Sequence, residues 1–557
     1  MAVSAALRER RRPWLAGVAV AVLLAVAAPG SGAIAPAAVF GASTDLTLVT
    51  NATYNVHPED QLASVSVAIA ARNHTRETRM RRFSFDHAFL AVQPGAVSPR
   101  VSGPKGARVQ VAKRTPDATL LRIGFGSRLY SGETANLRLT FDLPGHGTAA
   151  NSQVRVGASL ITLPVWAFAS EGARGSTVTV RFPPGWNPSV ESGSFARRST
   201  GSDGSTVLAT GALASPLSFF AFVSAQRPAV YDEHPLTLSV GDQQVDLLLQ
   251  PWEDDPGWTV RTAKLFSRAL PVLRDEIGLD WPHDRPMVVR EAVSRAAGGY
   301  AGLFDPAAGR IEVAYWADQM VMIHEAAHGW FNGSLLADRW ANEGFASYYA
   351  GRAAAALEVK AGTPELNDAV AAAEVPLNAW EVGSADGAGT QGATATDAYG
   401  YAASLAFATA VADRVGHEVL ARTWADAAGG IGAYQPPSTT EDSTPGSTRG
   451  ASTGATPESV GGPPDWRGLL DLLEAESGTG LVDLWRTWVV RPEEVALLDA
   501  RAATRASYAR TVALAGDWVL PRAIRDAMRE WQFDSAEQLM ADARTVLAQR
   551  NAVASMA

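Results

Sequence analysis

Two histidines four residues apart constrain this chain more than any other feature of its sequence. His324 and His328 enclose the run His-Glu-Ala-Ala-His, within residues 318–331, a stretch without proline that is predicted to be helical. Side chains four residues apart lie on one face of a helix, so both imidazoles can contact one metal ion. Buried imidazoles without a partner would be costly, which favours a shared metal ion over a chance pair on a surface helix. The sequence therefore predicts a metal-binding helix.

A third ligand follows in residues 338–349, where Glu343 would complete a His-His-Glu set. Zinc held by three protein ligands keeps a fourth position for water, which distinguishes a catalytic site from a structural one. Zinc lowers the pKa of that water to about 7, and Glu325 can accept its proton as the water attacks a carbonyl. The residues predict hydrolysis assisted by one zinc ion per chain, with His324, His328 and Glu343 as ligands and Glu325 as general base.

Asn342 directly precedes the expected glutamate ligand. Its side chain can hydrogen-bond to one imidazole and hold that ring in its metal-binding tautomer. It can equally cap the N-terminus of the helix that carries Glu343. The sequence leaves both roles open.

These residues resemble the aminopeptidase N-like family of gluzincin zinc metallopeptidases. The blocks HEAAHGWFN at 324–332 and DRWANEGFA at 338–346 carry the resemblance, and the gap between them is a few residues shorter than the family's usual spacing. The resemblance implies a peptide or protein substrate and a tyrosine whose hydroxyl stabilises the oxyanion. Tyr399 is the candidate and Tyr401 the runner-up, and the alternative is a tyrosine that packs at the start of a helix.

One family motif is missing. Aminopeptidases of this family carry a Gly-x-Met-Glu-Asn strand whose glutamate grips the substrate's free amine, and in residues 298–304 Ala301 takes its place. We therefore expect an endopeptidase or an unusual exopeptidase, unless another acid such as Glu312 reaches the site. The run 310–316 alternates like an edge strand that can pair with an extended peptide, although an ordinary sheet strand is slightly favoured. The alternatives are an ordinary aminopeptidase, a non-catalytic peptidase-like scaffold, and hydrolysis of a non-peptide bond.

The fold class expected is multidomain, with an N-terminal antiparallel β-sandwich, a thermolysin-like catalytic domain that passes from α/β to α, and C-terminal helices. Period-two alternation broken by Pro and Gly turns predicts the sandwich, and the change to mixed strands and helices predicts the catalytic domain. A segment rich in Pro, Ser, Thr and Gly predicts a disordered linker or insertion. The expected divisions are an export signal at 1–33, the sandwich at 43–228, the catalytic domain at 229–433, the linker at 434–465 and a helical region at 466–557.

The N-terminus has the three regions of an export signal: basic at 8–12, apolar at 14–28 and small at 31–33. The apolar run is short for a membrane span, which favours a cleaved signal over an anchor, with no stable span afterwards. Together with a composition that favours Arg over Lys, typical of high-GC bacteria, this predicts a secreted or cell-surface protein. A net charge of −9 argues against nucleic acid as a partner, and the absence of cysteine excludes thiolate ligands.

Overall fold

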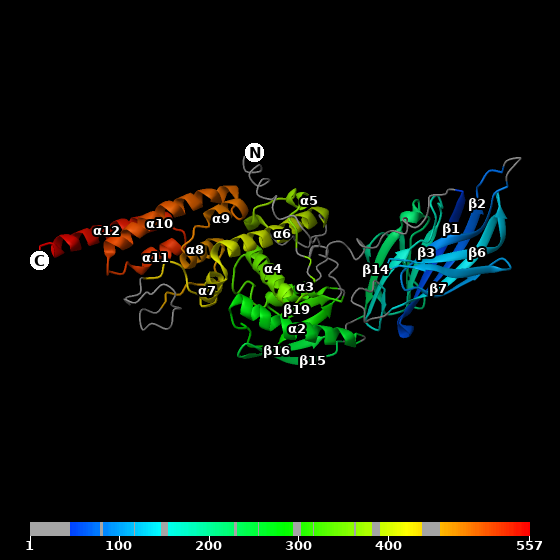
Figure 1. Cartoon of the computed structure of the whole chain (residues 1–557), viewed down its shortest axis with the longest axis horizontal. Helices are drawn as coiled ribbons and strands as arrows, with labels where there is room; N and C mark the ends of the chain where they lie inside the picture. The colour runs from blue at the N-terminus through cyan, green and yellow to red at the C-terminus, as the bar shows by residue number, and fades with distance from the viewer. Residues whose placement is uncertain are drawn as a thin grey trace.

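The computed structural model describes residues 45–77, 82–115, 117–145, 154–227, 231–253, 255–292, 302–315, 317–360, 362, 364–380, 390–436 and 457–556. The predicted export signal, Ala301 and residues 437–456 of the predicted linker lie outside these ranges. A sheet-rich domain lies at one end of the molecule and helices extend to the C-terminus at the other (Figure 1). In the described part of the chain, no helix is both long and apolar enough to cross a membrane.

Alternating side chains build the sheets of the N-terminal domain. Along β2 (Leu62–Asn73) every second residue is buried, as the period-two pattern predicts. The strands form a seven-stranded sheet in the order β12-β13-β10-β1-β2-β7-β4, a four-stranded sheet β11-β14-β9-β8 and a three-stranded sheet β3-β6-β5. One apolar core joins all three sheets. The other strands are β1 (Leu46–His57), β3 (Ser84–Val92), β4 (Val97–Ser102), β5 (Ala107–Arg114), β6 (Thr119–Tyr130), β7 (Thr134–Pro144), β8 (Arg155–Val156), β9 (Leu160–Trp166), β10 (Thr177–Phe182), β11 (Asn187–Ser192), β12 (Arg197–Thr200), β13 (Thr206–Ala209) and β14 (Phe220–Gln226).

The prediction of a wholly antiparallel sandwich is wrong at one pair of strands. β1 and β10 run parallel, with Asn51 opposite Thr177 and Asn55 opposite Arg181. Parallel neighbours need a long crossover between them, and here the chain passes through the other sheets before it returns to β10. Local alternation predicts the strands but carries no information about this return.

The middle of the chain forms a five-stranded mixed sheet in the order β15-β16-β17-β19-β18. Its strands are β15 (His234–Val240), β16 (Gln243–Gln250), β17 (Met287–Ala292), β18 (Gly302–Asp305) and β19 (Arg310–Ala314). β19 lies between two other strands, so the expectation of an ordinary sheet strand in 310–316 is correct and the edge-strand alternative is wrong. The strand at this edge of the sheet is β18, which pairs antiparallel with β19.

Helices enclose the second core together with this sheet, and the last helices of the chain add a smaller core of their own. They are α2 (Pro256–Ile277), α3 (Gln319–Ala327), α4 (Arg339–Ala356), α5 (Asp368–Ala371), α6 (Thr390–Val415), α7 (His417–Ala428), α8 (Trp466–Ser477), α9 (Val482–Trp488), α10 (Val495–Ala515), α11 (Arg522–Arg529) and α12 (Phe533–Ala554). Trp466 of α8 and Trp485 of α9 belong to the same core as α3 and α4. Gln435 and Glu458, which both lie inside the predicted linker at 434–465, hydrogen-bond to each other. The described residues at the two ends of that segment are therefore in contact.

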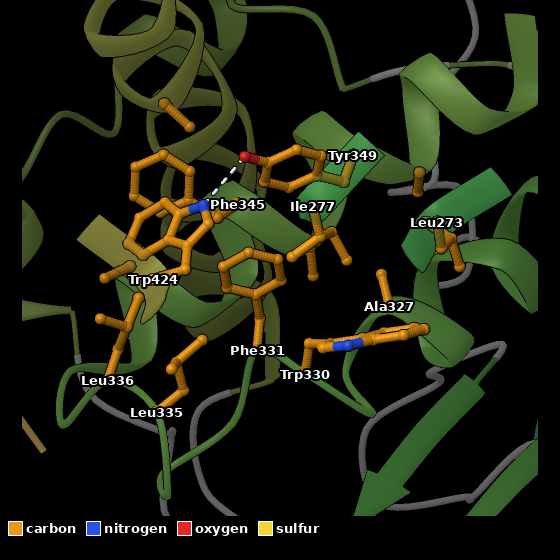
Figure 2. Close-up of a cluster of buried hydrophobic side chains, with 14 of the residues drawn as sticks. Leu273, Ile277, Ala327, Trp330, Phe331, Leu335, Leu336, Phe345, Tyr349 and Trp424 are labelled. Carbon is orange, nitrogen blue, oxygen red and sulfur yellow. Dashed lines mark hydrogen bonds between the residues drawn. The ribbon is translucent and has the colours of Figure 1, made fainter. Parts of the chain in front are cut away.

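A cluster of aromatic side chains fastens the α3 turn to α4 and α7 (Figure 2). The ring of Phe331 lies 5.3 Å from that of Tyr349 and 5.4 Å from that of Trp424. Trp424 donates its indole N–H to the Tyr349 hydroxyl at 2.9 Å, the dashed line in Figure 2. Close packing of large rings leaves few alternative arrangements. The two helices that follow one another at the metal motif are thus held rigidly.

Buried charges join the sandwich to the central sheet. Arg155 of β8 lies 2.8 Å from a carboxylate oxygen of Glu291 on β17 and 3.8 Å from Asp255, and each of the three side chains is 2% exposed or less. The hydroxyl of Tyr315 bonds to that of Thr162 at 2.9 Å across the same junction. Removing Glu291 or Asp255 would leave the buried guanidinium of Arg155 short of an acceptor, so this contact strongly restrains the junction.

Candidate metal centre

Helix α3 presents the two histidines on one face. Asp318 caps its N-terminus by accepting the N–H of Val321 at 2.9 Å, and the helix is apolar enough to be buried along its length. His328 follows α3 directly and keeps a right-handed helical conformation, so the spacing of four residues keeps its effect. The Nε2 atoms of His324 and His328 lie 3.1 Å apart. The predicted pair is therefore formed and buried.

Glu343 on α4 completes the group. Its Oε2 lies 3.3 Å from the Nε2 of His324 and 3.3 Å from that of His328. The three ligand atoms all lie within 4.8 Å of one another. The described residues offer this buried Oε2 no hydrogen-bond partner that meets ordinary geometry. The structure thus brings together the three ligands that the sequence predicts.

The hydrogen-bond partner of the outer ring nitrogen of His328 decides which nitrogen faces Glu343. Nδ1 of His328 lies 2.8 Å from the carbonyl oxygen of Phe331, and because a carbonyl only accepts, this nitrogen carries the proton. In the neutral ring, the Nε2 of His328 is then a lone pair that faces the carboxylate of Glu343. Lone pairs that face one another in a buried place repel, and either a second proton on the ring or a metal cation between the two groups removes the conflict. A nitrogen, nitrogen and oxygen donor set of this kind fits zinc.

Ser347 is a site residue that the sequence prediction missed. It lies one turn after Glu343 on α4, and its hydroxyl is 3.2 Å from Nδ1 of His324. The spacing of four residues between Glu343 and Ser347 was the available signal, because it puts both on the face that meets α3. Groups that hold the outer nitrogen of a ligand histidine orient the ring toward the metal.

Asn342 has neither of the roles predicted for it. Its side-chain amide donates to the backbone carbonyl of Leu336 at 2.8 Å and to that of Asp338 at 3.2 Å. It therefore braces the turn that leads into α4, one turn inside the helix, and Asp338 occupies the N-cap position. The turn between the motif helices is short, and this amide gives the carbonyl of Leu336 a donor and adds a second donor to the carbonyl of Asp338, which also accepts the backbone N–H of Asn342.

The charges of the group act on one another. Burial would lower the pKa of His328, but the nearby carboxylate of Glu343 outweighs burial and raises that pKa to about 9. Burial would raise the pKa of Glu343, but the two imidazoles hold it well below its usual range. Burial raises the pKa of Glu325. The centre therefore combines an ionised ligand with a desolvated carboxyl group beside it.

The edge strand β18 lies directly on Glu325. The backbone N–H of Phe304 donates to the Glu325 carboxylate, and the ring of Phe304 stacks on that of His328 at 6.2 Å. A Cβ added to Gly302 would lie 2.4 Å from Cγ of Glu325. Only glycine allows the strand this close, so Gly302 is a second site residue that the prediction missed. The neighbouring Ala301 lies outside the described residues.

Glu312, the alternative amine anchor, faces away from the centre. Paired residues on neighbouring strands share a face, and Phe304 pairs with Ile311 while Leu303 pairs with Glu312. Phe304 contacts His328, so Glu312 points to the opposite face of the sheet. There it lies 2.9 Å from the guanidinium of Arg310.

The two candidate tyrosines lie on α6. This helix packs tightly across α4, since a Cβ on Gly344 would lie 2.6 Å from the carbonyl oxygen of Ser404. Tyr399 is buried in the core shared with α3 and α4, and the hydroxyl of Tyr401 lies 3.4 Å from Nη2 of Arg339. The role of Tyr399 as an oxyanion donor stays a prediction.

No family model matches the chain, and no curated protein matches it. Solved structures do match it. An M1 zinc metallopeptidase from Deinococcus radiodurans has 18% sequence identity and a TM-score of 0.30 over 80% of this chain and 93% of that one. A mutant of that enzyme bound to a Tyr-Ser-Ala substrate has 19% identity and a TM-score of 0.31 over the same shares. Legionella pneumophila aminopeptidase A in complex with aspartic acid has 10% identity and a TM-score of 0.31 over 81% of this chain and 50% of that one.

Proposed function

We propose that this chain is a zinc-dependent metallopeptidase that hydrolyses peptide bonds. The observation that carries the proposal is the convergence of the His324, His328 and Glu343 donor atoms, with a buried glutamate next to them on α3. A non-catalytic scaffold has no need of such a glutamate, which argues against that alternative. We further propose that the protein is exported to the cell surface or the medium.

In this proposal the three ligand residues hold the zinc ion, and the residues beside them orient the general base and the substrate. When bound, zinc lowers the pKa of a water molecule and polarises the substrate carbonyl. Glu325 accepts a proton at its carboxylate and passes it to the leaving amine, as a general base and then a general acid. The N–H of Phe304 and the close approach of Gly302 fix the orientation of that carboxylate. Tyr399 is assigned to donate a hydrogen bond from its hydroxyl to the developing oxyanion.

The experiment is hydrolysis of internally quenched peptides by the purified protein, with and without a chelator. Glu325→Gln keeps the shape but cannot accept a proton, so turnover should fall by several orders of magnitude while zinc stays bound. Glu312→Gln is the matched control, because its carboxylate lies on the other face of the sheet. His324→Ala should lose the metal. Full turnover by Glu325→Gln, or no chelator-sensitive hydrolysis in the natural protein, would refute the proposal.

Matched pairs of acetylated and free peptides test the specificity of the enzyme. With alanine at 301 and Glu312 turned away, we expect acetylated peptides to be cut at least as well as free ones. The protein would then be an endopeptidase or an unusual exopeptidase. A strong preference for the free amine would instead make it an ordinary aminopeptidase.

A further inference from the structure

Arg339 begins α4 one turn before Glu343, so both side chains leave the same side of the helix. Its guanidinium carbon lies 3.9 Å from the centre of the Trp380 ring, and its Nη1 lies 3.3 Å from a carboxylate oxygen of Asp397. Trp380 belongs to the segment before α6, and Asp397 to α6 itself. One arginine on the metal-ligand helix thus contacts two segments distant from it in sequence.

The partners of Arg339 also contact one another. The indole N–H of Trp380 donates to Asp397 at 2.9 Å, to the oxygen that also faces Arg339. A Cβ on Gly400 would lie 2.2 Å from the Trp380 ring, so α6 approaches the indole this closely only because residue 400 is glycine. The Tyr401 ring meets that of Trp380 edge-on at 5.0 Å. Charge, hydrogen bond and ring contact together define one geometry for this end of α6.

The ion pair is largely withdrawn from solvent, with side chains of Arg339 and Asp397 exposed by 19% and 14%. Pairs at this depth are screened less than surface pairs. Arginine suits the place because its planar fork can stack on a ring while it contacts a carboxylate, which lysine cannot do. Burial works against its charge, but nearby groups, among them Tyr401 and Glu343, raise the pKa of Arg339 above its ordinary value. The guanidinium is therefore permanently charged.

We propose that Arg339 is a positioning residue that, through Asp397 and Trp380, holds Tyr399 in place relative to Glu343. Tyr399 lies between Asp397 and Tyr401 in the sequence of α6. Arg339 therefore contacts the helix two residues before and two residues after Tyr399. This inference rests on the proposed function and deepens it. An oxyanion donor works only in a narrow range of positions, and a misplacement of about 1 Å can cost on the order of a hundredfold in rate.

A double-mutant cycle in the full-length protein tests the proposal. Arg339→Met keeps the length of the side chain but removes its charge and its fork. We expect kcat to fall by about 10- to 100-fold with KM and zinc content nearly unchanged. In a Tyr399→Phe background the same change should cost less than about threefold, because the donor it positions is already absent. Arg352→Met is the matched control, since Arg352 is also on α4 and has an acidic and an aromatic partner.

A second variant covers the case in which Arg339→Met fails to fold. Asp397→Asn keeps an oxygen for the Trp380 indole but loses the charge, and it should show a smaller loss of the same kind that also vanishes in Tyr399→Phe. Losses that multiply in the double mutant, loss of zinc, or an unaffected Tyr399→Phe would each overturn the positioning role. The proposed function would fail differently, by the absence of chelator-sensitive hydrolysis in the natural protein.

Discussion

Replacing Gly302 by alanine should cut turnover while zinc stays bound. The added Cβ would lie 2.4 Å from Cγ and 2.5 Å from Oε1 of Glu325. Carbon atoms in contact are ordinarily about 3.5–4.0 Å apart, so the strand or the glutamate must move by roughly 1 Å. Glu325 is only 6% exposed and has little room to move. A displacement of this size in a general base corresponds to a loss on the order of a hundredfold in kcat.

The assay is kcat and KM on a quenched peptide, with zinc content and thermal unfolding measured in parallel. Overpacking should also destabilise the protein by about 1–3 kcal/mol. Gly333→Ala is the matched control, because a Cβ on Gly333, in the turn after the metal helix, would meet no atom of the described residues within 4 Å. Ordinary turnover by Gly302→Ala would show that β18 does not hold the base in its working position.

Three other predictions follow from the same contacts. Ser347→Ala removes the partner of the outer His324 nitrogen, so zinc affinity measured by chelator competition should fall by about 10- to 100-fold, and an unchanged affinity would argue against the role. Tyr399→Phe should lower turnover by roughly a hundredfold with the metal retained, and the same loss in Tyr401→Phe instead would move the donor to that residue. Burial raises the pKa of Glu291 to about 8, so its contribution to stability is full at low pH and declines as pH rises toward 8. The free energy of unfolding of the natural protein relative to Glu291→Gln should therefore fall over that window, by at most about 1.4 kcal/mol per pH unit, whereas a constant difference in denaturant titrations would contradict the shift.

The three candidate metal ligands were predictable because their signal is local. Helical spacing alone puts His324 and His328 on one face, and the second motif supplies Glu343 within a short distance along the chain. Strand alternation likewise predicted the sheets of the N-terminal domain, because burial of one face imposes period two wherever the strand is placed. These features depend only on residues that are close together in the sequence, so one sequence is enough to predict them.

Only the tertiary structure decided which distant segments meet at those ligands. The close approach of Gly302 to Glu325 and the contact of Arg339 with Asp397 join segments that no local pattern connects. The parallel return of β10 to β1 is of the same kind. Asn342 is a case in which the local signal misled. Its position beside a candidate ligand suggested a role at the metal site, whereas its side-chain amide donates to carbonyls of the short turn before α4. Sequence determines which faces must be buried, but the partner of each face is chosen by packing of the whole chain, where many contacts compete for the same space.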